Sequence, residues 1–433
     1  MDQNTVRVLS LDGGGIRGLY SATFLDLFLA EAGLNSEKLF DYFDLIIGTS
    51  IGGIQAIAYG AGKSPAWLRN FFVEQGSTIF PADAPSFIKT MIGWSSYYTM
   101  YGQAPLENAI KSAVGDKLMS DLDGNIVATT YNMHRNEPTL FSNIQNHEPF
   151  LRGHALKASD VALTTSAAPY YFPIKTIDGV DYTDGGVFQN NPALIALVIA
   201  KRLFPTRSRL CMLSVGTCDP YFKYNSLSTD SDRDGTKHYT PYATENHSPW
   251  AVNRHSYTEI AQEKLSAAYD YMKSWVTDWN NDFPQTGEMT HETFTDKLQS
   301  LFNEVLGDSF NTAVAIQYIK YLLENVFLSG PQFLADQSMS FYAKSIYQNV
   351  NYYRFQHSFT EEEQLKKYKT NETNQTVDLD AQPTSTDTTK AVFKSLDLAN
   401  TDPYYLDGLQ KLAEKDFNRD KTAITNFIRK FTL

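Results

Sequence analysis

Two glycine-rich blocks in the first part of the chain hold residue types that together could cleave an ester. Residues 12–18 (Asp-Gly-Gly-Gly-Ile-Arg-Gly) follow an apolar run, and the bare amides of such glycines can stabilise an oxyanion. Residues 48–53 (Gly-Thr-Ser-Ile-Gly-Gly) follow a second apolar run and place Ser50 in the pattern Gly-x-Ser-x-Gly, typical of a serine on a sharp turn between a strand and a helix. The two blocks therefore predict a nucleophile and the backbone donors that stabilise its intermediate.

The base that would activate this serine is predicted to be an aspartate. A serine hydroxyl is a poor nucleophile until a base takes its proton. The eight histidines of the chain lie in polar or amphipathic stretches, and none occupies a glycine turn after a strand. The better candidate is Asp184, which is followed by two glycines and then by Asn-Asn-Pro at the head of a predicted helix. An aspartate must act here through short contact and desolvation, because it is a weak base in water. The alternative is that Asp184 only shapes an Asx turn.

Two charged side chains of the first block are candidates for supporting roles. Arg17 could brace the loop or meet a phosphate, and its alternative is an ordinary surface position on the first helical turn. Asp12 is expected to be structural, since a carboxylate ahead of the glycines can accept N–H bonds that hold the turn.

The same block also matches a different kind of site. Gly13, Gly15 and Gly18 satisfy the dinucleotide-binding fingerprint, which keeps a non-hydrolytic nucleotide-binding protein open as the alternative function. The acidic residue that such a site needs at the end of the second strand is missing, because that strand ends in Gly-Thr-Ser. Two other lookalikes are weaker. Residues 60–64 lack the first glycine of a phosphate loop, and the loop opened by residues 230–235 lacks the final glutamate of a calcium site.

The elements around these blocks alternate between strand and helix. Residues 6–11 and 43–47 are β-rich, while residues 17–32 and 51–61 carry apolar residues at helical spacing. Such alternation predicts an α/β fold with a mostly parallel sheet sandwiched by helices, and it places the active groups at the carboxyl ends of the strands. Further strands are expected at residues 126–130 and 210–215, and a helix at residues 192–203.

The catalytic α/β core is expected over residues 1–220. Residues 221–433 are predicted to form a mostly helical elaboration with polar loops, in one continuous domain with the core. Helical spacing covers residues 254–328 and 403–431, one late strand is expected at 350–356, and polar tracts lie at 224–249 and 369–390.

The composition of the chain limits the classes of partner that it is expected to bind. The 433 residues carry a formal net charge of −12, which argues against binding nucleic acid and against docking on anionic lipid through bulk charge. Two cysteines, no apolar stretch long enough to span a membrane and a polar start favour a soluble protein with reduced thiols. Residues 88–101 are rich in aromatic and apolar types, which suits either a rim that touches lipid or ordinary packing beneath a loop.

These motifs resemble those of the patatin-like phospholipase family. The resemblance covers residues 12–18, 48–53, 184–186 with 190–192, and 213–216, and more faintly residues 351–356 and the terminal helix. It implies the three-layer patatin-like fold and a lipid acyl hydrolase of the phospholipase A or lysophospholipase type, with no metal and no cofactor. The implied site comprises the nucleophile Ser50 with its flanking Gly48 and Gly52, the base Asp184 with Gly185 and Gly186, an oxyanion hole of Gly13, Gly14, Gly15 and Ile51, and loop support from Asp12, Arg17 and Gly18.

The resemblance also sets expectations about partners and location. Membrane lipids or lysolipids are the implied substrates, reached by transient contact with a membrane surface, and an activator is left open. Bacterial members of the family include delivered toxins and nucleotide-triggered defence effectors. The expected location is therefore the cytoplasm, or a host cell after delivery by a specialised secretion system.

Overall fold

The computed structural model describes residues 2–81, 99–145, 151–169, 171–218, 335, 339, 342–357 and 398–432. The chain divides into two compact units, Met1–Tyr221 with Leu323–Leu433, and Phe222–Leu322. All the described residues belong to the first unit, which is the one presented below. The predictions for residues 224–249, 254–328 and 369–390, and for most of the aromatic segment 88–101, lie outside the described residues.

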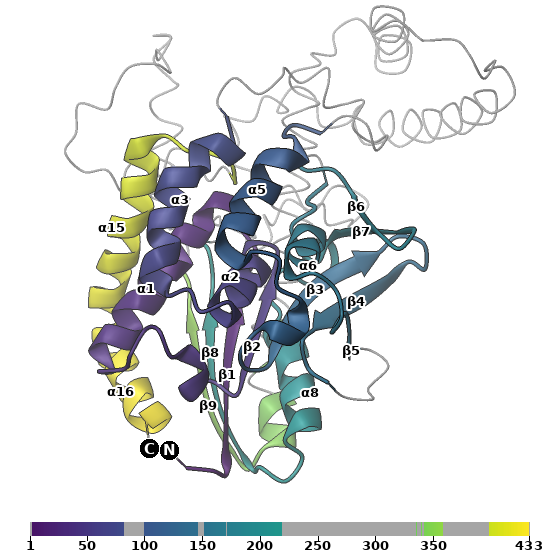
Figure 1. Ribbon diagram of the computed structural model, residues 1–433. Helices are drawn as coiled ribbons and strands as arrows, with labels where there is room; N and C mark the ends of the chain where they lie inside the picture. Colours follow the sequence, from purple (N-terminus) through teal and green to yellow (C-terminus); the bar gives the residue numbers. More distant parts are fainter. Residues whose placement is uncertain are drawn as a thin grey trace, which may run out of the picture. The chain divides into compact units, whose positions relative to one another are not determined.

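The central sheet is built from buried apolar runs (Figure 1). β1 (Thr5–Leu11) is buried along its whole length and pairs in parallel with β2 (Leu45–Thr49) on one side and β8 (Arg209–Val215) on the other. β9 (Asn349–Phe355) pairs in parallel with β8, although it comes late in the chain. The described strands follow the order β5-β4-β3-β2-β1-β8-β9, with β7 paired to both β3 and β6. The remaining strands are β3 (Ile126–Asn132), β4 (Glu137–Ser142), β5 (Leu151–Arg152), β6 (Lys175–Ile177) and β7 (Val180–Asp184).

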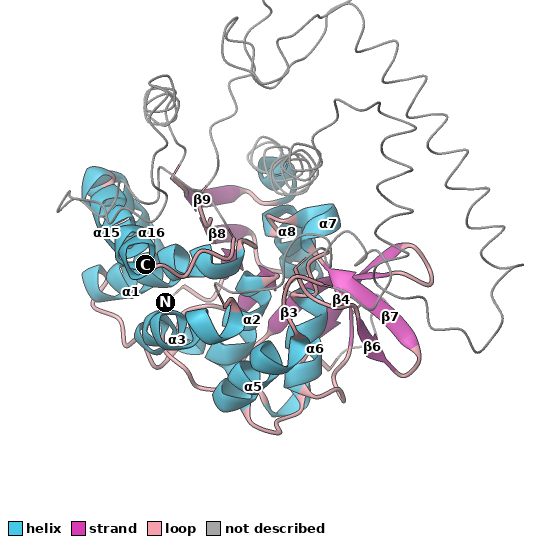
Figure 2. Ribbon diagram, turned by 90° about the horizontal axis from the view of Figure 1, so that it is seen from above, coloured by secondary structure: helices cyan, strands magenta, loops and turns pink. Residues whose placement is uncertain are grey.

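Helices cover both faces of this sheet (Figure 2). Along β1 the side chains alternate, so that Leu9 and Leu11 join the apolar core under one helical layer and Val6 and Val8 join the core under the other. The second core includes the buried face of α8 (Ala193–Leu203). The first core is covered by α1 (Gly18–Glu31), α2 (Ile51–Gly60), α3 (Pro65–Ile79), α5 (Gln103–Val114), α6 (Ala158–Thr165), α15 (Pro403–Arg419) and α16 (Lys421–Thr432).

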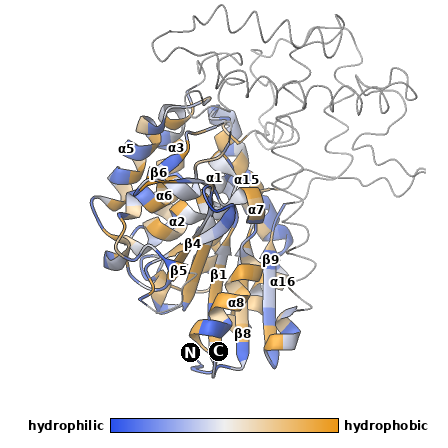
Figure 3. Cartoon of the chain, turned by 90° about the vertical axis from the view of Figure 1, so that its right-hand side faces the viewer, coloured by the Kyte–Doolittle hydropathy of each residue, from blue (hydrophilic) through white to orange (hydrophobic). Residues whose placement is uncertain are grey.

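This arrangement confirms the predicted fold class, a mostly parallel sheet sandwiched by helices with further helices near the carboxyl end. Strands in the middle of the sheet are coloured as hydrophobic in Figure 3, as expected for a sheet buried on both faces. Both cysteines, Cys211 and Cys218, are buried, and neither forms a disulfide. No helix among the described residues is long and apolar enough to cross a membrane.

The register of the strands decides which turns meet. Leu11 pairs with Gly48 across β1 and β2, so the two glycine-rich blocks leave the sheet side by side. Thr129 of β3 pairs with Thr49, and its neighbour Thr130 pairs with Asp184 at the end of β7. The ends of β1, β2 and β7 therefore converge at one edge of the sheet.

Candidate active site

Ser50 lies on the sharp turn between β2 and α2 that its motif predicts. Its backbone has φ 54° and ψ −123°, a conformation that side-chain-bearing residues rarely adopt. The flanking glycines make this turn sterically feasible. A Cβ at Gly48 would clash with the backbone of Gly52, and a Cβ at Gly52 would clash with the carbonyl group of Leu11. The pattern Gly-x-Ser-x-Gly is therefore explained by close backbone packing at the strand end.

Asp184 meets Ser50 at this edge of the sheet. The Ser50 side chain interacts with the buried Asp184 carboxylate, which also accepts the backbone amide of Gly186 at 2.6 Å. Burial raises the pKa of Asp184 to about 7, while the hydrogen bonds from Ser50 and Gly186 act in the opposite direction. The contact with Gly186 is the local Asx-type turn considered as the alternative. Asp184 thus shapes its own turn and also contacts the serine.

The glycine loop differs in one respect from the expected oxyanion hole. The backbone amide of Gly13 already donates to the carbonyl of Asn190 at 3.2 Å, so it is engaged within the protein. Gly14, Gly15 and Ile51 line the pocket beside Ser50. Ile51 is the first residue of α2, where helix amides have no intrahelical acceptor and the helix dipole is positive. These three are therefore the members of the predicted oxyanion hole that line the pocket, whereas Gly13 is not among the lining residues.

Arg17 is buried and braces the loop, which excludes the surface alternative. Its Nε donates to the carbonyl of Gly14 at 3.4 Å, and a terminal nitrogen donates to the carbonyl of Cys218 at 3.0 Å. The hydroxyl of Thr217 donates to the carbonyl of Gly13 at 2.6 Å. The glycine loop is thus held in place by Thr217 and Cys218, which follow the end of β8.

Asp12 is structural, as expected, but through a partner that sequence reasoning missed. Its two carboxylate oxygens accept the two terminal nitrogens of Arg354, which reaches across from β9. One of these nitrogens also donates to the Ser214 hydroxyl at 2.9 Å. The sequence did carry one signal, because Arg354 is the one charged residue in the strand predicted at residues 350–356.

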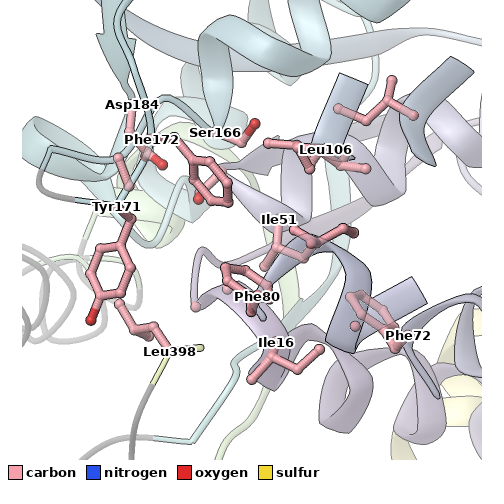
Figure 4. A pocket seen from close by; sticks show the side chains of 18 of the residues that line it. Ile16, Ile51, Phe72, Phe80, Leu106, Ser166, Tyr171, Phe172, Asp184 and Leu398 are labelled. Carbon is pink, nitrogen blue, oxygen red and sulfur yellow. The ribbon is translucent and has the colours of Figure 1, made fainter. Parts of the chain in front are cut away.

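An apolar pocket extends away from Ser50 and Asp184 and is lined in part by residues of α2, α3 and α5. In Figure 4, Asp184 lies at one side of this pocket, Leu106 and Phe72 lie at the other, and Ile51 lies between them. The few polar groups along its wall include the Ser166 hydroxyl and the Asn190 side chain. The apolar wall includes Ile16, Ile51, Ile54, Phe71, Phe72, Ile79, Phe80, Leu106, Ile110, Tyr171, Phe172 and Leu398.

No histidine is among the described residues that line this pocket. His357 is buried elsewhere and bonds through Nδ1 to the Asp416 carboxylate at 2.7 Å, and the same carboxylate accepts the Tyr20 hydroxyl at 2.9 Å. Within the described ranges, no group of three or more His, Cys, Asp or Glu side chains could hold a metal ion. The group in contact with Ser50 that could take its proton is therefore Asp184.

Comparison with known proteins relates part of the chain to one family. The family model "Patatin-like phospholipase" matches residues 9–197. A cGAMP-activated phospholipase of Vibrio cholerae serotype O1 is 39% identical over 208 residues, covering 45% of this chain and 58% of the relative. Patatin-like protein 2 of Arabidopsis thaliana is 33% identical over 254 residues, covering 49% of this chain and 60% of the relative.

The chain spans about three fifths of the length of these curated relatives. Among solved structures, VipD from Legionella pneumophila aligns with 97% of this chain and 88% of its own, at 13% identity and a TM-score of 0.32. That score is too low to support an inference about fold or function.

Proposed function

We propose that this chain, whose residues 9–197 belong to the patatin-like phospholipase family, releases fatty acids from glycerophospholipids or lysophospholipids through an acyl-enzyme on Ser50. The observation that carries the proposal is that Ser50 and the buried Asp184 carboxylate interact and lie together in the wall of an apolar pocket. A nucleophile, a base and an apolar binding space are thereby joined at one place.

In the proposed reaction, Asp184 takes the proton of Ser50 as the serine oxygen attacks the acyl carbonyl. The amides of Gly14, Gly15 and Ile51 would donate to the oxyanion that forms. Collapse of this intermediate expels the glyceryl oxygen, which takes the proton from Asp184. Water then attacks the acyl-enzyme with Asp184 again acting as the base, and the fatty acid leaves.

The apolar lining of the pocket supports the proposal that the acyl chain of the substrate binds there. Burying methylene groups against Ile51, Phe72 and Leu106 would stabilise a fatty chain by about 0.8 kcal/mol for each CH₂. The polar headgroup would stay at the mouth of the pocket, where transient contact with a lipid surface would deliver the substrate. Cytoplasmic action, or action in a host cell after delivery, stays a prediction from the family resemblance.

An activator belongs to the same proposal. The Vibrio cholerae relative is named as a cGAMP-activated phospholipase, and this name supports testing a cyclic dinucleotide on the present chain. Each assay below is therefore run with and without cyclic GMP-AMP.

The deciding experiment measures fatty acids released from phosphatidylcholine and phosphatidylethanolamine vesicles by mass spectrometry. Ser50→Ala and Asp184→Asn should abolish release and fluorophosphonate labelling while circular dichroism shows a folded protein. Ser112→Ala and Asp116→Asn, which change exposed residues of the same types, serve as matched controls. Full turnover by either site variant would refute the assigned roles. Binding of NAD(P) without serine labelling in the wild type would instead favour the nucleotide-binding alternative.

A further inference from the structure

The carboxyl end of α6 contacts both members of the Ser50–Asp184 pair. The Thr165 hydroxyl oxygen accepts the backbone amide of Ser50 at 2.9 Å. Two residues later, the carbonyl of Ala167 accepts the backbone amide of Asp184 at 3.0 Å. Residues 165–167 thus fix the separation between the nucleophile and the proposed base.

Thr165 also ties Ser50 to the neighbouring strand. Its hydroxyl donates to the carbonyl of Thr129 in β3 at 2.6 Å, so a single oxygen bridges the serine turn and the sheet. The Thr129 hydroxyl in turn shares a hydrogen bond of 2.8 Å with Thr49, the residue before the nucleophile. All three threonines are fully buried, so water is not there to replace these bonds.

The hydroxyl matters more than the size of this side chain. With valine at position 165 the shape would be kept, but the Ser50 amide and the Thr129 carbonyl would each lose a partner in a dry interior. Because Ser50 has a positive φ, its turn depends on the surrounding contacts to stay in place. A turn that relaxes would carry the Ser50 hydroxyl away from Asp184.

We propose that Thr165 is a positioning residue for the Ser50–Asp184 dyad, setting through its hydroxyl the contact between nucleophile and base. This inference rests on the proposed hydrolase function. Thr165 does not touch the substrate in this role, and its effect passes through the Ser50 backbone.

The test compares Thr165→Val, which removes the hydroxyl, with Thr165→Ser, which keeps it. Thr164→Val is the matched control, because Thr164 is the adjacent, equally buried threonine whose hydroxyl bonds only to the Val161 carbonyl of its own helix. The rate of fluorophosphonate labelling of Ser50 is measured across pH, and so are kcat and KM for a soluble butyryl ester. Thermal unfolding of each variant shows whether it is folded, and Thr165→Ala replaces the valine variant should that one not fold.

We expect Thr165→Val to lower kcat and the labelling rate by about tenfold to about a hundredfold with little change in KM. The Ser50 hydrogen bond lowers the pKa of Asp184, so weakening it should move the acid limb of the pH profile upward by about one unit. Thr165→Ser should recover both the rate and the profile, and Thr164→Val should behave like the wild type.

Three results would overturn the proposal in different ways. Wild-type rates and an unshifted profile in Thr165→Val would remove the positioning role while leaving the hydrolase proposal intact. A wild-type protein that is neither labelled nor active on any ester or vesicle, with or without cyclic GMP-AMP, would refute the proposed function and this inference with it. Equal losses in Thr164→Val and Thr165→Val would show a general effect on α6 and would also overturn the positioning role.

Discussion

Arg354 and Asp12 form a two-pronged ion pair that joins β9 to the start of the glycine loop. The Asp12 side chain is fully buried and that of Arg354 is 12% exposed, so the pair lies almost entirely out of water. β1, β8 and β9 are neighbours in the sheet, which brings the arginine across Ser214 to the aspartate. β9, which comes late in the chain, therefore anchors Asp12 at the start of the loop that carries the proposed oxyanion donors.

Breaking this pair should damage both stability and turnover. Arg354→Met keeps most of the apolar stem but removes the guanidinium from the buried Asp12 carboxylate, which we expect to cost about 3 to 5 kcal/mol of unfolding free energy. Turnover should fall about tenfold or more as the loop loses its anchor. Urea denaturation and vesicle assays measure the two effects.

A matched control comes from the adjacent strand β8. Arg209 pairs with Asp2 at 3.3 Å but is 55% exposed, so Arg209→Met should cost less than about 1 kcal/mol. The double variant Arg354→Met with Asp12→Asn should be more stable than Arg354→Met alone, because it also removes the buried carboxylate charge that the arginine neutralised. Equal stability of the Arg354 and Arg209 variants would contradict the anchoring role.

The pH dependence of activity follows from the pKa of Asp184, which burial raises to about 7. The base must be deprotonated to accept the Ser50 proton, so kcat/KM should fall by about tenfold for each unit of pH below about 7. A soluble ester assayed between about pH 5 and about pH 9 would measure this limb. A rate that stays constant down to about pH 5, as the pKa of about 4 for an exposed aspartate would give, would show that Asp184 with its raised pKa is not the base.

The same group should make stability depend on pH. Because the pKa of Asp184 is higher in the folded state than the ordinary aspartate value of 3.8, the folded protein binds the proton more tightly than the unfolded chain. The stabilising contribution is full below about pH 4 and is lost as the pH rises toward about 7, by up to about 1.4 kcal/mol for each unit.

Asp184→Asn removes this titration and keeps an oxygen that can accept the Gly186 amide. The variant should therefore be inactive yet gain stability relative to the wild type between about pH 4 and about pH 7. Denaturation midpoints at both ends of that range measure the difference. A constant difference between the two proteins across this range would show that Asp184 is not desolvated.

Much of the fold follows from local pattern. The predicted strand at residues 6–11 corresponds to β1 (Thr5–Leu11), and the late strand expected at 350–356 corresponds to β9 (Asn349–Phe355). Apolar periodicity identifies such elements because burial on one or both faces dictates it. The glycines around Ser50 were informative for a related reason, since only glycine fits where backbones approach so closely.

The supporting contacts could not be predicted because they depend on tertiary register. Arg354 lies 342 residues from Asp12, and nothing near either residue shows that β9 sits beside β8. The engagement of the Gly13 amide likewise depends on where the Asn190 carbonyl is placed. Thr165 carries no local signal, because its role arises only where α6 meets the end of β2.

The pocket makes a final prediction about the length of the acyl chain. Ile110 of α5 is 1% exposed and lines the pocket with Leu106, so added bulk there would shorten the space for a chain. Ile110→Phe should lower the ratio of kcat/KM for a palmitoyl ester to that for a butyryl ester by about tenfold, the value of roughly two buried methylene groups. Val73→Phe, on the solvent side of α3 at 48% exposure, should leave the ratio unchanged. An unchanged ratio in a folded Ile110→Phe variant would show that the acyl chain does not reach α5.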